Sequence, residues 1–86
     1  MRKIVEEVNE EGLESMLGER ITLLCMNYIY TGKLVGVNAT CVLLESPAIV
    51  YETGAWSEKG YKDAQALPSR LYVNLTAIEA FGPLKG

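Results

Sequence analysis

The 86-residue sequence has no histidine and only two cysteines, Cys25 and Cys41. Without histidine the chain lacks the means to form a Ser-His-Asp triad, a histidine-ligated zinc site or a thiolate activated by imidazole. Two cysteines are also too few for a cysteine-rich metal centre or a disulfide scaffold. We therefore expect no enzyme activity and no metal or other cofactor. We interpret the cysteines as free core thiols, typical of a reducing cytosol, with one disulfide between them as the alternative.

Long apolar segments are lacking as well. Wholly apolar stretches such as residues 23–26 are far too short to span a membrane. The first residues, Met1, Arg2 and Lys3, lead into a glutamate-rich segment and not into the apolar core of a secretory signal. We therefore expect a cytoplasmic protein with no membrane partner.

The chain is short for its apolar content. Its 86 residues make a single small domain, and hydrophobic residues account for 49% of them. Small domains bury little surface and often depend on disulfides, a metal or association with other copies for their stability. Because the composition argues against the first two, it favours an oligomer.

Strong positive charge is also absent. The net charge is −3: residues 1–19 carry six glutamates against two basic residues, which gives −4, and residues 20–86 carry six basic and five acidic residues, which gives +1. Binding to long duplexes depends on neutralising many phosphates. We therefore expect no interaction with double-stranded DNA.

The spacing of apolar residues predicts one helix followed by five antiparallel strands. An N-terminal arm covers residues 1–9, of which 2–8 are left without an assigned structure, and a helix over 10–17 ends at Gly18. The strands are expected in the segments 21–26, 28–39, 41–51, 66–74 and 78–82, and a variable polar loop is expected over 52–64.

Two glycines in the second strand and a proline in the third predict strong bending. Gly32 and Gly36 are four residues apart, which is typical of a sharply bent strand or a bulge, and Pro47 predicts a break or bulge in the strand that follows. Bent strands in so short a chain favour a small barrel of SH3-like or OB-like type over residues 20–82.

The order of these motifs resembles the Sm/LSm/Hfq family. The first family motif is matched by residues 17–23 (LGERITL) followed by residues 30–38 (YTGKLVGVN), and the second is matched more loosely by residues 74–81 (NLTAIEAF). The resemblance covers residues 10–82. It implies a mainly β fold, in which an N-terminal α-helix precedes a strongly bent, five-stranded antiparallel barrel.

The resemblance also implies partners. Members of this family form cyclic homo-oligomers by pairing the fourth strand of one subunit with the fifth strand of the next, which here are residues 67–74 and 78–81. They bind single-stranded, uridine-rich RNA at the pore. The family positions that contact RNA correspond to Thr40, Val42 and Asn74, and none of these three keeps the family's usual side chain. Asn38 lies in the same turn as Thr40. The resemblance therefore implies an RNA pocket of altered chemistry at Asn38, Thr40 and Asn74.

The polar loop holds a second candidate surface. Trp56, Lys59, Tyr61 and Lys62 alternate aromatic rings with cations, a pattern that suits stacking on bases and contact with phosphates. The alternative is an extended hairpin whose rings pack on the barrel or on a neighbour.

Two functions follow from the sequence. The first is an Sm-like ring that binds single-stranded RNA through an altered pocket. The second is an Sm-like barrel that serves protein contacts or assembly without RNA, which the altered residues and the acidic charge balance favour.

Overall fold

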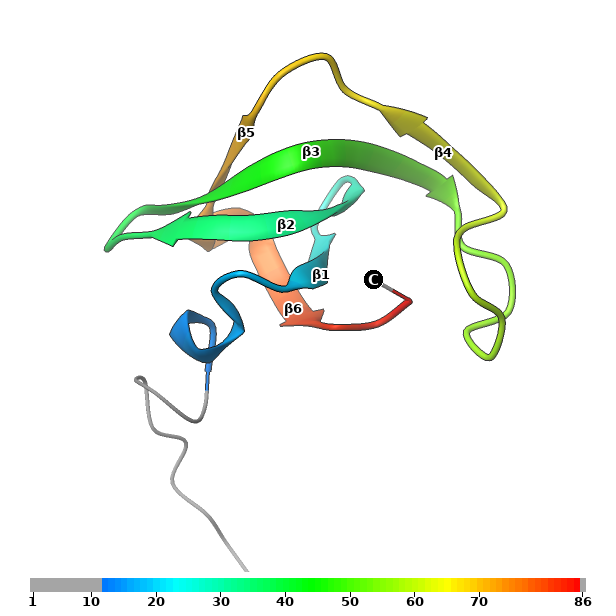
Figure 1. Ribbon diagram of the computed structural model, residues 1–86, viewed down its shortest axis with the longest axis horizontal. Coiled ribbons are helices and arrows are strands. Elements are labelled where there is room, and N and C mark those ends of the chain that lie inside the picture. The colour runs from blue at the N-terminus through cyan, green and yellow to red at the C-terminus, as the bar shows by residue number, and fades with distance from the viewer. Residues whose placement is uncertain (1–11, 86) are drawn as a thin grey trace, which may run out of the picture.

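A computed structural model describes residues 12–85, and Figure 1 shows their arrangement. The chain is mainly β, as the sequence predicts. Two single turns of 3-10 helix, η1 and η2, accompany six strands. In chain order the elements are η1 (Glu14–Met16), β1 (Arg20–Cys25), β2 (Ile29–Val37), β3 (Cys41–Glu52), β4 (Asp63–Ala66), β5 (Leu71–Asn74), η2 (Leu75–Ala77) and β6 (Ile78–Gly82).

All six strands belong to one open antiparallel sheet. The order is β4-β3-β2-β1-β6, and β5 also pairs with β3, beyond the end of β4. Figure 1 shows the long strand β3 as an arch, with β4 and β5 along its outer side and β6 at the far end of the sheet. The two edges of the sheet are therefore β6 and the pair formed by β4 and β5, which we call the β4/β5 edge.

The arch bends where the paired strands β2 and β3 approach each other closely, at Gly32. Thr31 pairs with Ala48 and Lys33 with Glu45, so Ser46 and Pro47 together lie opposite Gly32 in a β-bulge. A Cβ at Gly32 would lie 3.2 Å from the Glu45 carbonyl oxygen and 3.2 Å from the Pro47 Cα. The bend predicted from Gly32 and Pro47 is thus confirmed, and glycine is needed because the two backbones approach so closely.

The same bulge divides the fourth predicted strand, so the prediction of five strands is wrong. Residues 66–74 do not form one strand: β4 begins at Asp63, inside the predicted loop, and ends at Ala66, and β5 starts at Leu71. Ala66 pairs with Ala48 and Leu71 with Leu44, so the four residues 67–70 span only three residues of β3. Leu67 still donates its N–H to the Pro47 carbonyl at 2.9 Å, and the pairing with β3 is lost after it, where the register is not continuous and Pro68 has no N–H to donate.

The predicted helix over 10–17 is also corrected where the structure describes it. Residues 12–17 hold only the 3-10 turn η1, and residues 10 and 11, like the arm 1–9, lie outside the described residues. Gly12 has a φ of 80°, in the left-handed region, and Leu17 is already extended with a ψ of 131°. An α-helix cannot include either conformation, which leaves room for a single turn.

A small apolar core lies on the concave side of the arch. Its members are fully or almost fully buried and come from β1, β2, β3 and β5: Ile21, Leu23, Leu34, Val42, Leu44 and Val73. Cys25 and Cys41 are both free and only half-buried, so the interpretation of the pair as buried core thiols is corrected: Cys25 packs against this core from outside it.

We predict that Gly32→Ala destabilises the fold more than Gly36→Ala does. A Cβ at position 32 would lie 3.2 Å from three atoms, two of them backbone atoms that cannot rotate away, whereas at position 36 it would make one tight contact, with the Leu43 Cβ at 3.3 Å. We expect a loss of about 1–3 kcal/mol in the free energy of unfolding for Gly32→Ala, typical of overpacking. Urea denaturation of the two variants measures this, and equal midpoints would contradict the role given to Gly32.

Candidate nucleic-acid interface

The candidate interface begins with a tight turn between β2 and β3. The Asn38 side-chain oxygen accepts hydrogen bonds from the Thr40 N–H at 2.8 Å, the Cys41 N–H at 2.9 Å and the Thr40 hydroxyl at 3.1 Å. This is the local bonding for which Asn is favoured in turns. All three residues of the turn, 38–40, are exposed. The oxygen of Asn38 is therefore used to shape the turn, and its amide nitrogen is the group left to face a ligand.

The end of β5 lies directly against this turn. Asn74 pairs with Cys41, and the N–H of Leu75 donates to the Thr40 carbonyl at 2.9 Å. Asn74 is exposed, and its side chain makes no hydrogen bond with any residue in the range 12–85. The structure thus brings together the three residues predicted from the sequence, Asn38, Thr40 and Asn74, at one end of the sheet.

Val42 does not share this position. The resemblance places Val42 where the family has a base-contacting Asn, but here its side chain is 0% exposed and forms part of the core. The third strand therefore turns this side chain inward, and Val42 is not a site residue.

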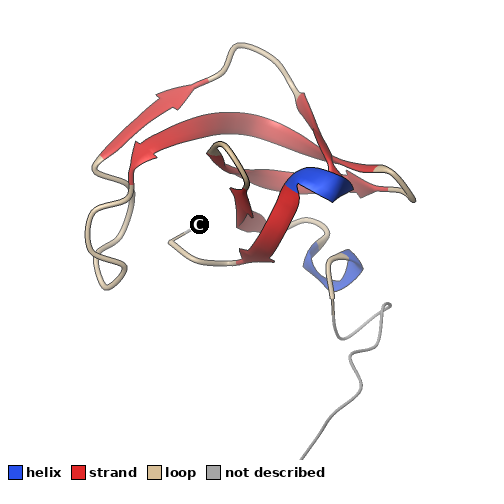
Figure 2. Cartoon of the chain, turned by 180° about the vertical axis from the view of Figure 1, so that it is seen from behind, coloured by secondary structure: helices blue, strands red, loops and turns tan. Residues whose placement is uncertain are grey.

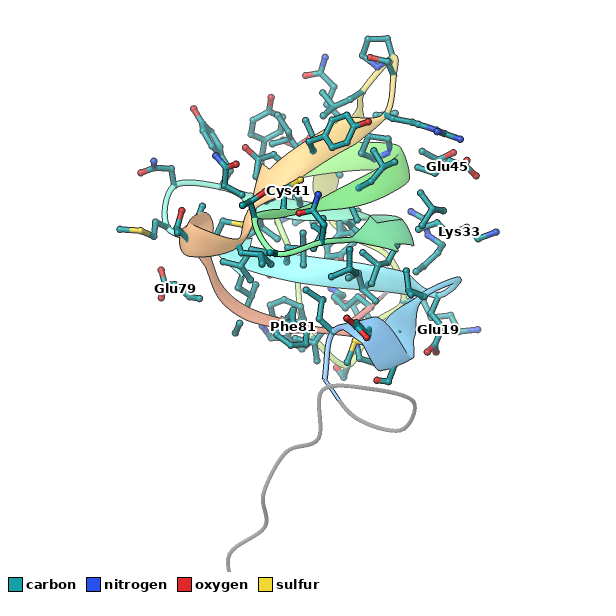
Figure 3. The ribbon with its side chains drawn as sticks, turned by 90° about the vertical axis from the view of Figure 1, so that its left-hand side faces the viewer. Glu19, Lys33, Cys41, Glu45, Glu79 and Phe81 are labelled. Carbon is teal, nitrogen blue, oxygen red and sulfur yellow. The ribbon has the colours of Figure 1, made fainter. Side chains whose placement is uncertain are left out.

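Two shallow hollows meet at Asn38. One of about 220 Å³ is lined by Gly36, Val37, Asn38, Cys41, Leu43 and Tyr72. The other, of about 660 Å³, is lined by Gly12, Leu13, Glu14, Val37, Asn38, Ala39, Leu75 and Phe81. Figure 3 looks toward this end of the molecule and shows Cys41 and Phe81 on it.

Each hollow contains one exposed aromatic ring that the sequence did not indicate as a site residue. Tyr72 is 69% exposed and Phe81 is 39% exposed. In the sequence, both residues were assigned only to edge strands that contact other subunits. The register between β5 and β3 could have indicated Tyr72, because Tyr72 pairs with Leu43 on the strand that follows the Asn38 turn. Rings beside free amide groups offer both stacking and hydrogen bonding to a nucleobase.

The electrostatics of the two hollows are close to neutral. Glu14 is the one charged side chain among the residues that line them, and neither lysine nor arginine contributes. A ligand held here would be recognised through stacking and amide hydrogen bonds, with little contribution from phosphate neutralisation.

The predicted loop surface is partly engaged within the chain. Lys62 forms an ion pair with Glu52 at 3.4 Å, and the Tyr61 hydroxyl donates to the Leu84 carbonyl at 2.9 Å. Trp56 and Tyr61 both face the Lys85 ammonium. Lys59 is exposed and lines a hollow of about 430 Å³. Tyr61 is half-buried, whereas Trp56 remains 48% exposed, so this surface is only partly engaged within the molecule.

Neither a membrane-spanning helix nor a metal centre emerges from the described part of the chain. No helix within residues 12–85 has the length and apolar character to cross a bilayer. In the same range, no three His, Cys, Asp or Glu side chains are grouped so that they could hold a metal ion.

Comparisons of the chain with protein-family models, curated proteins and solved structures found no match.

We predict that Cys25 reacts slowly with thiol reagents and that Glu79→Gln accelerates the reaction. Burial raises the pKa of the Cys25 thiol, and the nearby Glu79 carboxylate raises it further. A raised pKa leaves less thiolate at neutral pH, and the thiolate is the species that reacts. Removing the negative charge lowers the pKa toward its ordinary value. Rates of iodoacetamide alkylation against pH, measured in a Cys41→Ser background, test this, and Glu14→Gln is the charge-matched control. An unchanged rate profile for Glu79→Gln would contradict it.

Proposed function

We propose that the chain is the subunit of a cyclic homo-oligomer of Sm-like architecture, which binds single-stranded RNA at the end of the sheet that carries Asn38, Thr40 and Asn74. The observation that carries the proposal is the pair of free sheet edges. Within residues 12–85, β6 pairs only with β1, and β4 and β5 pair only with β3. The fourth and fifth strands expected from the sequence thus lie at opposite edges, as pairing between successive subunits requires.

The composition of β5 and β6 supports pairing, whereas β4 (DAQA), the other part of the β4/β5 edge, carries Asp63. Monomeric proteins protect exposed sheet edges with lysine, proline or other features that prevent another strand from adding. Neither β5 (LYVN) nor β6 (IEAFG) contains a lysine or a proline, and Glu79 is their one charged residue. β6 also exposes the apolar side chain of Ala80, which lies outside both hollows. Addition of a neighbouring β6 to the β4/β5 edge would cover unpaired backbone groups and part of this apolar surface.

The bend supports a barrel-like subunit. The bulge at Gly32 turns the sheet into an arch, and the core lies on its inner side. In the proposed ring each arch is completed by contact with its neighbours. Apolar residues that do not fit in the core of a single subunit would then be buried between subunits.

The RNA part of the proposal rests on the two hollows at Asn38. The amide group of Asn38, which lines both hollows, suits the edge of an unpaired base, and Tyr72 and Phe81 would supply the stacking surface that Thr40 lacks. Asn74 lines neither hollow, but it is exposed and pairs with Cys41 at the same end of the sheet. Stacking of one base on an aromatic side chain contributes about 1–3 kcal/mol. In a ring, each copy would present one such site on the same face.

A second function is favoured by one specific observation. No lysine or arginine lines the hollows at Asn38. Their linings are mostly apolar, which equally suits a protein segment. In this alternative the ring or barrel is an assembly module for protein contacts and binds no RNA.

We predict that the wild-type chain sediments as a ring of several subunits and that Ala80→Lys reduces the assembly to smaller species. Ala80 is an exposed residue in the middle of β6, where a lysine would oppose strand addition. Ala55→Lys makes the same change at an exposed position outside both edges and should leave the mass unaltered. Sedimentation velocity or native mass spectrometry measures the outcome. A monomeric wild type would refute the ring, and an intact Ala80→Lys assembly would refute pairing through β6.

We predict that oligo-uridine or oligo-adenine binds the ring with a shallow dependence on salt, because no cation lines the hollows. Tyr72→Ala or Phe81→Ala should weaken binding about 5- to 150-fold, which corresponds to the loss of one stacking contact. Asn74→Ala should weaken it about 2- to 10-fold, as expected for one hydrogen bond.

Fluorescence anisotropy with labelled oligonucleotides at two salt concentrations tests these effects. Asn27→Ala, which removes an exposed amide outside both hollows, is the control. An intact ring that binds neither oligonucleotide at low salt would favour the assembly function over RNA binding.

A further inference from the structure

The last described residues, 83–85, form a strap that returns toward the middle of the molecule. They follow β6 and end on the concave side of the arch, facing the loop that connects β3 to β4 (Figures 1 and 2). The strap thus connects two parts of the fold that do not pair in the sheet, the β6 edge and the loop between β3 and β4.

Leu84 is tied to both of these parts through its backbone. Its carbonyl oxygen accepts a hydrogen bond from the Tyr61 hydroxyl at 2.9 Å and another from the Thr22 hydroxyl. Thr22 belongs to β1 and is fully buried, so this end of the strap is anchored in the sheet. Tyr61 is half-buried by the same contacts.

Lys85 places its ammonium group between two aromatic rings of the loop. Its Nζ lies 5.6 Å from the centroid of the Trp56 ring and 5.5 Å from that of the Tyr61 ring, and it donates a hydrogen bond to the Thr53 carbonyl. A cation within about 6 Å of an aromatic face is attracted by the negative potential of the ring. Two rings and a carbonyl oxygen therefore surround one ammonium group.

The loop backbone is shaped to bring these groups together. Gly54 and Gly60 have φ values of 72° and 73°, a conformation that side chains disfavour, and they bracket the segment that carries Trp56. Acidic side chains are also near: Glu52 and Glu58 line the hollow that Lys85 and Tyr61 share. The surroundings of Lys85 thus suit a positive group.

We propose that Trp56, Tyr61 and the Thr53 carbonyl form a binding site for an alkylammonium group, and that the chain's own Lys85 occupies it and latches the strap 83–85 to the loop. The proposal does not depend on RNA binding or on ring formation. The sequence predicts that Trp56 and Tyr61 stack on nucleobases. In this proposal their ligand is an ammonium group instead, because Lys85 faces both rings while the latch is closed.

The test uses Trp56, the only tryptophan of the chain, as a fluorescent reporter. Lys85→Ala removes the internal ligand and should change the emission of Trp56. Lys85→Arg keeps a cation for the rings and should retain the wild-type emission. An emission spectrum of Lys85→Ala identical to that of the wild type would overturn the proposal.

The vacated site should then accept a free ligand. We expect n-butylammonium, which has the same four-carbon chain and charged end as a lysine side chain, to titrate the Trp56 emission of Lys85→Ala saturably and return it toward the wild-type spectrum. The wild type should respond at least several-fold less at the same concentrations. Titrations are made at constant ionic strength, with n-butanol and sodium chloride as controls.

A second pair of variants separates the ring from the hydroxyl of Tyr61. In the Lys85→Ala background, Tyr61→Phe should keep the response to n-butylammonium and Tyr61→Ala should lose it, with circular dichroism used to verify that both are folded. A response that survives in folded Tyr61→Ala, or that n-butanol reproduces, would overturn the site.

Discussion

The close approach of two backbones at Gly32 is the constraint on which the rest of this structure depends. No side chain fits between Gly32 and the bulged segment of β3, so the two paired strands approach closely here and the sheet bends. The bend creates an inner face that six buried side chains can fill, which is how so short a chain obtains a core at all. It also divides the partner of β3 into β4 and β5, because their register cannot continue past the bulge.

The arch determines where the functional candidates lie. The turn at Asn38 and the end of β5 meet at one end of the sheet, and the loop that carries Trp56 and Tyr61 lies at the other. The two ends differ in chemistry. Amide groups and single exposed rings characterise the first, whereas one ion pair and a half-buried lysine that faces two rings characterise the second. The Sm-like proposal concerns the first end and the two edges, and the latch concerns the second.

Local signals in the sequence were sufficient for much of this fold. The alternating strands, the bulge at Gly32 and Pro47, and the turn at Asn38 each follow from a few neighbouring residues, and the structure contains all of them. The sequence could not reveal the division of the fourth strand, because that division depends on how many residues lie opposite a bulge in another strand. For the same reason it did not identify Tyr72 and Phe81, whose position beside Asn38 follows from strand pairing. Lys85 was missed because its partners are more than twenty residues away in the chain.

The division of the β4/β5 edge has a consequence for how this sheet opens. All four residues of β4 are exposed, so its attachment to β3 consists mainly of backbone hydrogen bonds. β5, by contrast, buries Val73 in the core. Since the ladder is interrupted between Leu67, whose N–H donates to the Pro47 carbonyl, and Leu71, we expect that separation of β4 from β3 does not propagate into β5. We therefore expect the edge to open as two units, an inner one that unfolds with the core and an outer one whose amide protons exchange with solvent through local opening.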